Sequence, residues 1–284
     1  MSKEPHIFDR SGHAALADLE TPRWKELFAL MEKEQAEFLA KESAFRSPDY
    51  KWPRDPLHTW SRVWEYPYAY EHLSAMRSAD QAGSMPVVVD LGSGVTFFPF
   101  SVARLGYRVV CTDVDPVCGK DILRAEKAVS VSPGSVSWKA TNGQELPFEN
   151  NSVDGIYCVS VLEHIPSFDV TVKEMARILK PGSMLILTID IDLIGNKEIG
   201  PAKYRVLKRL LDNQFEYVHF PATVHPLDML NSTTGPFRFI EPNFAEKAMF
   251  RTKNMIKLLL ARRRAKPPWP VSRLAVEGMV YKKR

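Results

Sequence analysis

The sequence predicts an α/β fold: a mostly parallel sheet with helices on both faces and an antiparallel final strand. Short apolar runs rich in β-branched residues recur from Val87 onward, and segments of helical length separate them. Strands that alternate with helices at this spacing are typical of βαβ units, whose helices cover both faces of the sheet. The predicted strands are VVVDL, YRVVCTDVD, SVSWKAT, VDGIYCVSVL and SMLILTIDID, and the helices between them are FFPFSVARLG, GKDILRAEKAVS and DVTVKEMARILKPG.

Residues 1–84 precede the first of these strands and form a helical and aromatic segment. Apolar residues recur at helical spacing over residues 14–45, and Thr21 before Pro22 is typical of a helix N-cap. A proline-rich connector follows, and then WSRVWEYPYAYEHLSAM, which is dense in aromatic residues and partly helical. We expect this segment to cover the acceptor site as a lid, with plain core packing as the alternative.

Residues 85–284 form the predicted main domain, with an insertion around residues 193–270. In the insertion, PAKYRVLKRLLDNQFEYV predicts an amphipathic helix, TVHPLDMLNSTTGPF a polar loop or short helix, and AEKAMFRTKNMIKLLLARRRAK a basic helix. LAVEGMVYKK predicts the closing antiparallel strand at or near the edge of the sheet.

The net charge of +4 conceals an asymmetry. Residues 245–284 contain 12 Lys and Arg against 2 Asp and Glu, which is +10, and the rest of the chain contains 26 against 32, which is −6. An anionic partner or a solvated basic helix face would each explain this tail. No apolar run is long enough to span a bilayer and the N-terminus lacks a signal-peptide core, so we expect a cytoplasmic protein with no membrane partner. The three cysteines lack metal-site spacing, and no metal is expected.

The turn after the first predicted strand indicates a ligand-binding loop. Asp90, Gly92, Ser93 and Gly94 stand at the carboxyl end of that strand, where ligands of open α/β sheets bind. The dinucleotide pattern GxGxxG fails because Phe97 occupies the position of its third glycine. The Asp90 carboxylate would repel a pyrophosphate but attract the ammonium and sulfonium of S-adenosylmethionine (SAM), so the charge favours SAM over NAD.

A second acid ends the second predicted strand. Asp113 lies 23 residues after Asp90, close to the separation at which an acid accepts hydrogen bonds from ribose hydroxyls. Asp115 is the rival for this role. Because Pro116 follows it, Asp115 better suits the cap of the next helix.

These motifs together resemble a known family. VVVDLGSG, YRVVCTDVDP, LPFENNSVDGIYCVSVLEHI and MARILKPGSMLILTI are similar, in order and spacing, to the motifs of class I SAM-dependent methyltransferases, above all their small-molecule group. The resemblance covers about residues 85–192 and implies a Rossmann-like fold with a seven-stranded sheet. Thr96 departs from it, since the family has a third glycine there, and so does Ser183 in its KPGG motif.

The resemblance also implies a role for each cofactor-binding residue. Asp90 and the turn Gly92–Gly94 would contact the methionine part of SAM, and Asp113 would bind the ribose. The adenine would contact Val114, Asn142 and Gly143, and Ser160 would face the methionine part or the acceptor. Glu163 and His164 would be structural, with an acid/base pair as the alternative.

Candidates for binding or activating the methyl acceptor lie outside these motifs. The aromatic segment offers Arg62, Trp64, Tyr66 and Tyr68, because aromatic faces hold cations and an arginine binds carboxylates. Tyr66 and Tyr68 are also candidate catalytic residues. His225 and Asp228 are three apart, on one face if helical, and would act as base and orienting acid, or Asp228 would only cap a helix. Tyr204 is a further acceptor-binding candidate.

The sequence therefore predicts a SAM-dependent methyltransferase acting on an O, N or S atom of a small molecule. Two alternatives stay open: an RNA or protein methyltransferase that uses the basic C-terminal region, and a SAM-binding module without turnover. Nucleic acid is not the expected partner, because VSVL stands where nucleic-acid amino-methylating enzymes of this fold carry a DPPY-type tetrapeptide. The sequence does not predict the oligomeric state.

Overall fold

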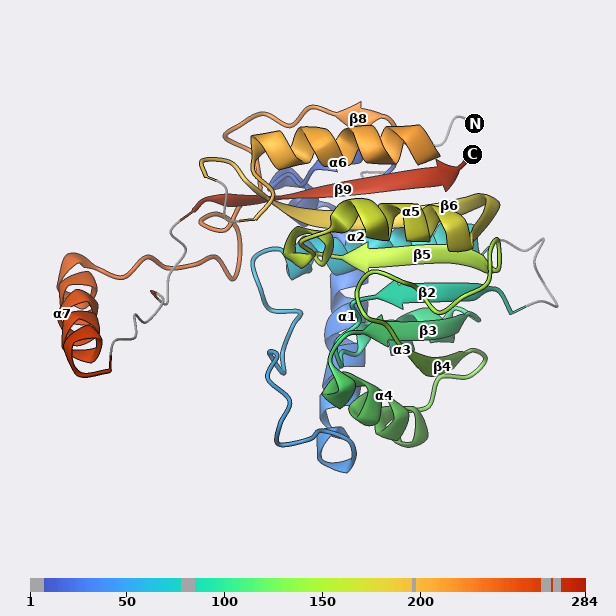
Figure 1. Ribbon diagram of the computed structural model, residues 1–284, viewed down its shortest axis with the longest axis horizontal. Helices are drawn as coiled ribbons and strands as arrows, with labels where there is room; N and C mark the ends of the chain where they lie inside the picture. Colours follow the sequence, from blue (N-terminus) through green and yellow to red (C-terminus); the bar gives the residue numbers. More distant parts are fainter. Residues whose placement is uncertain (1–7, 78–84, 196–197, 262–266, 268–271) are drawn as a thin grey trace.

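A sheet of nine strands organises the described part of the computed structural model, which comprises residues 8–77, 85–195, 198–261, 267 and 272–284 (Figure 1). The strands are β1 (Ser11–His13), β2 (Val87–Leu91), β3 (Arg108–Asp113), β4 (Ser135–Ala140), β5 (Val153–Val159), β6 (Leu179–Asp192), β7 (Phe215–Tyr217), β8 (Pro221–Ala222) and β9 (Leu274–Lys283). Their order across the sheet is β4-β3-β2-β5-β6-β9-β1-β8, and β7 also pairs with β9.

The strand directions confirm the predicted fold class. Strands β2 to β6 run parallel to their neighbours, and β9 runs antiparallel to β6 from Met184 opposite Lys282 to Asp192 opposite Leu274. The seven strands that the resemblance implies correspond to β2 to β7 and β9. Two short strands, β1 and β8, extend this sheet beyond β9.

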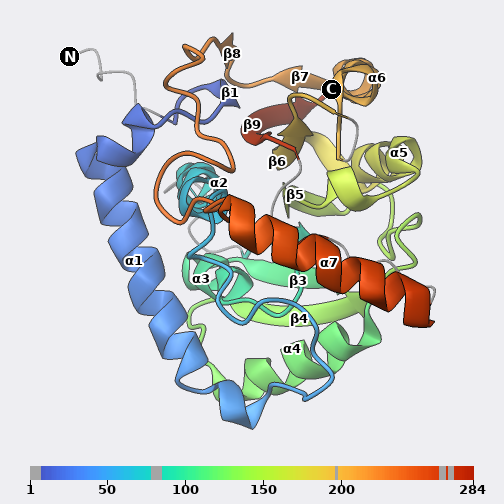
Figure 2. The same ribbon diagram turned by 90° about the vertical axis from the view of Figure 1, so that its left-hand side faces the viewer.

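Helices cover both faces of the sheet, as predicted (Figure 2). The helices are α1 (Pro22–Leu39), α2 (Arg62–Met76), α3 (Phe98–Arg104), α4 (Pro116–Ala128), α5 (Phe168–Ile178), α6 (Pro201–Gln214) and α7 (Phe244–Ala261). Successive side chains of a strand point to opposite faces. Val88 accordingly packs in a core with α1 to α4, whereas Val89 packs in a second core with α5 and α6.

The N-terminal segment packs into the first of these cores. Helix α1 starts at Pro22, with the Thr21 hydroxyl accepting a hydrogen bond from the Trp24 amide at 3.2 Å, as its cap signal predicts. The helix expected from residue 14 therefore begins later, after a short 3-10 helix at Ala17–Glu20. Helix α2 is buried along most of its length, so the core packing weighed for it is present.

The insertion around residues 193–270 departs most from the prediction. The amphipathic helix α6 ends at Gln214, and the residues expected to continue it form β7 instead. Residues 226–228 form a turn and not a helix. The predicted basic helix corresponds to α7, and its last residues, 262–266, lie outside the described part. Helix α7 stands apart from the sheet, on the side toward which β2 and β5 point (Figures 1 and 2).

None of the helices among the described residues is both long enough and apolar enough to cross a membrane.

Candidate active site

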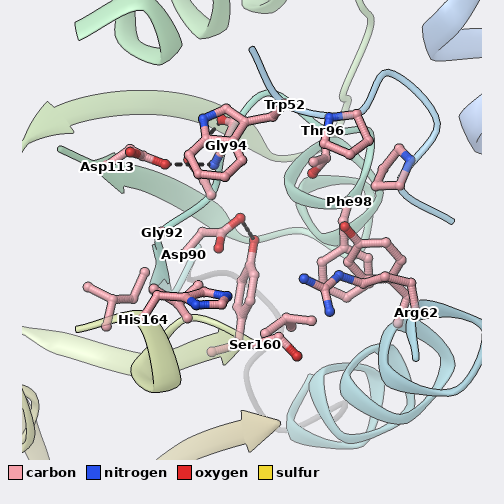
Figure 3. Close-up of a pocket in the computed structure, with 18 of the residues that line it drawn as sticks. Trp52, Arg62, Asp90, Gly92, Gly94, Thr96, Phe98, Asp113, Ser160 and His164 are labelled. Atoms are coloured by element: carbon pink, nitrogen blue, oxygen red, sulfur yellow. Dashed lines mark hydrogen bonds between the residues drawn. The ribbon is translucent and has the colours of Figure 1, made fainter. Parts of the chain in front are cut away.

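A cavity of about 410 Å³ lies where the carboxyl ends of β2, β3 and β5 meet (Figure 3). Its walls come from the turn after β2, the ends of β3, β5 and β6, the first turn of α2 and the connector before α2. This is the edge at which open α/β sheets bind ligands. Ten of the predicted site residues line it: Arg62, Tyr66, Asp90, Gly92, Ser93, Gly94, Asp113, Val114, Gly143 and Ser160.

The glycine turn requires glycine at two positions. Gly92 and Gly94 have φ angles of +71° and +54°, in the left-handed region that side chains disfavour. A Cβ atom on Gly92 would also lie 2.6 Å from the side chain of Val161. Thr96 is absent from the described non-glycine residues with positive φ. The backbone at position 96 therefore has no need of the family's third glycine.

The structure distinguishes the two acids after β3. The Asp113 carboxylate lines the cavity and accepts hydrogen bonds from the amides of Gly94 and Asp115, both at 3.0 Å. It thereby connects the end of β3 to the glycine turn (Figure 3). Asp115 caps α4 by accepting a hydrogen bond from the Val117 amide at 2.9 Å. Asp113 is thus the acid that faces the ligand space.

Asp90 lies at the floor of the cavity. It is buried, and Tyr157 donates a hydrogen bond to its Oδ2 at 2.9 Å. Burial raises the pKa of Asp90 to about 8, and the nearby Asp113 adds to this shift while the Tyr157 hydroxyl opposes it. Among the described residues no cationic side chain contributes to the shift, so a cationic ligand group in the cavity would stabilise the Asp90 carboxylate.

A network of buried polar groups forms the opposite end of the cavity, around Arg62 and Ser160 (Figure 3). The Ser160 hydroxyl donates to Glu65 Oε1 at 2.5 Å, and Arg62 forms an ion pair with Glu65. Ser160 has a φ of +48°, an uncommon conformation for a serine. Such backbone strain is found where a side chain has to be held in a functional position.

Asp190, at the carboxyl end of β6, adds a carboxyl group to this end of the cavity. Its side chain lines the cavity, and its buried Oδ1 has no hydrogen-bond partner among the described residues. Its backbone amide donates to Glu163 Oε1 at 3.0 Å. Burial raises the pKa of Glu163 to about 8 and that of Asp190 well above its usual range, and the other carboxylates nearby reinforce both shifts. A buried oxygen without a hydrogen-bond partner calls for an explanation, and a ligand that approaches it in the cavity would be one.

Asn142 does not line the cavity, contrary to the role that the resemblance implies. Its side-chain carbonyl accepts hydrogen bonds from the amides of Gln144 and Glu145, at 2.9 and 2.8 Å. The residue borders a separate hollow with Glu174 and Arg177. Its side chain therefore shapes the loop that carries Gly143, which does line the cavity beside Val114.

Three residues that were predicted to bind or activate the acceptor, Trp64, Tyr68 and Tyr204, do not line the cavity, because their side chains pack elsewhere. The Trp64 indole donates to Asp18 at 2.8 Å, and the Tyr68 hydroxyl donates to the Arg10 carbonyl at 3.0 Å, both fully buried. Tyr204 donates to Glu277 at 2.9 Å. On α2, positions 62 and 66 share one face and positions 64 and 68 the other, because a helix turns about 100° per residue. Only the first face meets the cavity.

His225 and Asp228 also fall outside the cavity, in the turn that replaces the expected helix. His225 is exposed, and its Nδ1 accepts a hydrogen bond from the Leu227 amide at 3.3 Å. The Asp228 carboxylate accepts one from the Ala17 amide at 3.0 Å. Asp228 therefore connects the insertion to the N-terminal segment, and the placement of both residues contradicts the predicted base and orienting acid.

Sequence reasoning missed several residues that line the cavity. The proline-rich connector contributes Tyr50 and Trp52, and the Tyr50 hydroxyl accepts a hydrogen bond from the Val95 amide at 3.1 Å. The aromatic residues among the prolines of this connector could have identified it as part of the cavity wall. His164 lines the cavity, although the resemblance implies a structural role for it. Asp190 lies two residues before the end of the fifth predicted strand, SMLILTIDID, and an acid near the end of a strand was the same signal that identified Asp90 and Asp113.

Residues 89–187 match a family model described as a methyltransferase domain. The match runs from β2 into β6 and so includes the glycine turn, Asp113 and Ser160.

Two curated proteins are similar to part of the chain. A ubiquinone biosynthesis O-methyltransferase of Xanthomonas axonopodis pv. citri (strain 306) is 30% identical over 138 residues, which are 48% of this chain and 52% of that protein. The biotin biosynthesis bifunctional protein BioHC of Cellvibrio japonicus (strain Ueda107) is 28% identical over 132 residues, which are 46% of this chain and 23% of that protein. The matched region thus spans about half the length of the first relative.

Among solved structures, the [4+2]-cyclase SpnF has a similar fold. The TM-score is 0.52 at 15% sequence identity, over 96% of this chain and 99% of that one. The likeness is one of fold alone.

Proposed function

We propose that this chain, whose residues 89–187 match a methyltransferase domain, transfers the methyl group of SAM to an O, N or S atom of a small molecule. One observation carries the proposal. A single cavity contains the glycine turn with Asp90 and Asp113 at one end, and a second polar end with Arg62 and Asp190. A methyltransferase has to hold the cofactor and the acceptor next to each other, so their two binding regions have to lie in one cavity.

The first end fits SAM. Asp90 is a buried carboxyl without a cationic partner and suits the ammonium group. Asp113 presents a carboxylate suited to ribose hydroxyls, and Val114, which is 63% exposed, offers an apolar surface for the adenine beside Gly143. Bound SAM supplies a methyl group on a positively charged sulfur, which an in-line displacement transfers.

The second end would hold and orient the acceptor. Arg62 and Tyr66 face the cavity from successive turns of α2, and Arg62 balances the charge of Glu65. Asp190 Oδ1 is placed to accept a hydrogen bond or a proton from the acceptor. A base is required only for an acceptor that is protonated at working pH, and Asp190 is the described residue best placed for that role.

An oxygen acceptor is the favoured case. The Xanthomonas relative is named a ubiquinone biosynthesis O-methyltransferase, and the Cellvibrio relative is named a biotin biosynthesis bifunctional protein. A cavity of about 410 Å³ is also of the size that holds small ligands. We further propose a cytoplasmic location for this activity.

Transfer of labelled methyl groups tests this proposal. The chain would be incubated with methyl-labelled SAM and, separately, with the small-molecule, RNA and protein fractions of a cell extract. We expect label in the small-molecule fraction, and much less with Asp190→Asn at unchanged SAM affinity. Label confined to RNA or protein would contradict the proposed acceptor class. SAM binding without transfer to any fraction would instead favour a binding module.

A further inference from the structure

The exposed apolar surface of the protein is concentrated in one segment. Thirteen of the twenty exposed large apolar side chains of the described residues lie between positions 218 and 260. Seven of them belong to α7: Phe244, Met249, Met255, Ile256, Leu258, Leu259 and Leu260. Clusters of this kind mark surfaces that another molecule covers.

These side chains form one face of α7. At 3.6 residues per turn, Phe244, Met255 and Leu259 line up, and Met249, Ile256 and Leu260 form an adjacent row. Phe244, Leu259 and Leu260 are 86%, 79% and 83% exposed. A stripe that would normally pack against a core thus faces solvent over the 18 residues of the helix, a length of about 27 Å.

Local sequence favours the start of this helix. The Asn243 amide donates to the Glu246 carboxylate at 2.8 Å, and the Glu246 amide donates to Asn243 Oδ1 at 2.9 Å. This reciprocal arrangement is a capping box, which stabilises the first turn of a helix. An exposed helix needs such stabilisation because tertiary packing usually supplies most of its stability.

Basic side chains flank the apolar face. Lys247 borders it on one edge and Lys253 on the other, while Arg251 lies within it and Lys257 lies on the opposite side. Within α7, four basic residues stand against one acid, Glu246. Cationic side chains at the borders of an apolar face are typical of helices that lie in the interface of an anionic membrane, where the long stems reach the head groups.

We propose that α7 is an interfacial helix that docks the protein onto the surface of a membrane containing anionic lipids. The expectation of no membrane partner rested on the lack of a segment long enough to cross a bilayer. A helix that lies on the bilayer surface binds the membrane in a different way. Since α7 stands on the side toward which β2 and β5 point, docking would turn the cavity edge of the sheet toward the lipid (Figures 1 and 2). The proposal is independent of the acceptor.

RNA fits this surface less well. A nucleic acid would satisfy Arg251, Lys253 and Lys257, but it would leave the apolar face exposed, because unpaired bases stack on aromatic rings and α7 presents mainly aliphatic side chains. A lipid surface covers the apolar face and the basic borders at the same time.

Vesicle co-sedimentation of the full chain tests the proposal. We expect the chain to pellet with vesicles of phosphatidylglycerol and phosphatidylcholine, more weakly with phosphatidylcholine alone, and less as salt rises. The double variant Ile256→Asp with Leu259→Asp should lower the bound fraction at least about tenfold. The matched control is Leu123→Asp, which charges an apolar side chain of α4 that is 48% exposed, and it should bind as the parent does.

Circular dichroism and SAM titration would show that each variant is folded. Failure of the parent chain to bind anionic vesicles would overturn the proposal, as would undiminished binding by the double variant. So would a parent dimer that the double variant converts to a monomer without vesicle binding, because a second copy would then cover α7. Retention of RNA but not of vesicles would assign the surface to nucleic acid.

Discussion

At the scale of single residues, neighbouring acids in this chain have different functions because their backbone positions differ. Asp113 ends β3 and turns its carboxylate to the glycine turn, while Asp115 stands one step before α4 and caps it. The sequence distinguished them correctly, since Pro116 marks the helix start. What the sequence could not show is that Asp113 also anchors Gly94.

Replacement of Asp113 by alanine should weaken SAM binding without unfolding the protein. If the carboxylate accepts hydrogen bonds from the ribose, its loss should cost about 1–3 kcal/mol of binding free energy. Calorimetric titration with SAM measures this. The matched control is Asp115→Ala, which should lower the free energy of unfolding by about 1 kcal/mol through loss of the cap and leave SAM affinity nearly unchanged. Equal SAM affinities for the parent and Asp113→Ala would refute the assignment.

SAM affinity should depend on pH through Asp90. Its pKa of about 8 means that the carboxyl is mostly protonated at pH 7, whereas the ammonium group of SAM favours the carboxylate. Binding should therefore release a proton, and affinity should rise between pH 6 and 8 by up to about tenfold per pH unit. Calorimetry in buffers of different ionisation enthalpy measures the released proton. In Asp90→Asn this release should vanish; its persistence would mean that another group titrates.

At the scale of elements, the face that each helix presents decides which residues reach the cavity. Of the aromatic segment before β2, Ser61, Arg62 and Tyr66 line the cavity. Helix α2 is buried on all sides, so it has no polar face that would mark a solvent side. The sequence therefore does not predict which face of the helix meets the cavity. The connector before α2 was missed for a related reason: its aromatic residues carry no periodic signal.

Two tyrosines of α2 provide a matched pair. Tyr66→Phe removes a hydroxyl that faces the cavity and should lower turnover by roughly threefold to tenfold, with SAM affinity unchanged. Tyr68→Phe removes a buried hydrogen bond to the Arg10 carbonyl, so it should cost about 1 kcal/mol of stability and leave turnover intact. Steady-state kinetics and denaturant unfolding separate the two effects. The opposite pattern would place the other face of α2 at the acceptor.

The glycine turn supplies another test at this scale. Gly92→Ala combines a left-handed backbone with a contact of 2.6 Å to Val161, so we expect SAM affinity to fall at least about tenfold. Thr96→Gly should change it by less than about fivefold, the scale of added backbone freedom, because position 96 does not need a glycine conformation. A large gain of affinity in Thr96→Gly would show that the threonine obstructs the cofactor.

At the scale of the whole molecule, the fold could be predicted from residues 85–192 because strands and helices there alternate with clear periods. The insertion after β6 could not. His225 and Asp228 looked like a helical pair, yet the local chain forms a turn and joins the N-terminal segment. Such contacts between segments 200 residues apart leave no trace in local periodicity. The second polar end of the cavity likewise combines distant parts of the sequence, since Asp190 lies near Glu65, 125 residues before it.

Titration of the full chain with SAM by calorimetry tests the central claim most directly, because every proposed step depends on the cofactor occupying this cavity. We predict saturable binding of one SAM per chain, weakened in Asp113→Ala and coupled to proton release through Asp90. The absence of any binding heat at millimolar SAM, confirmed by equilibrium dialysis, would contradict the account.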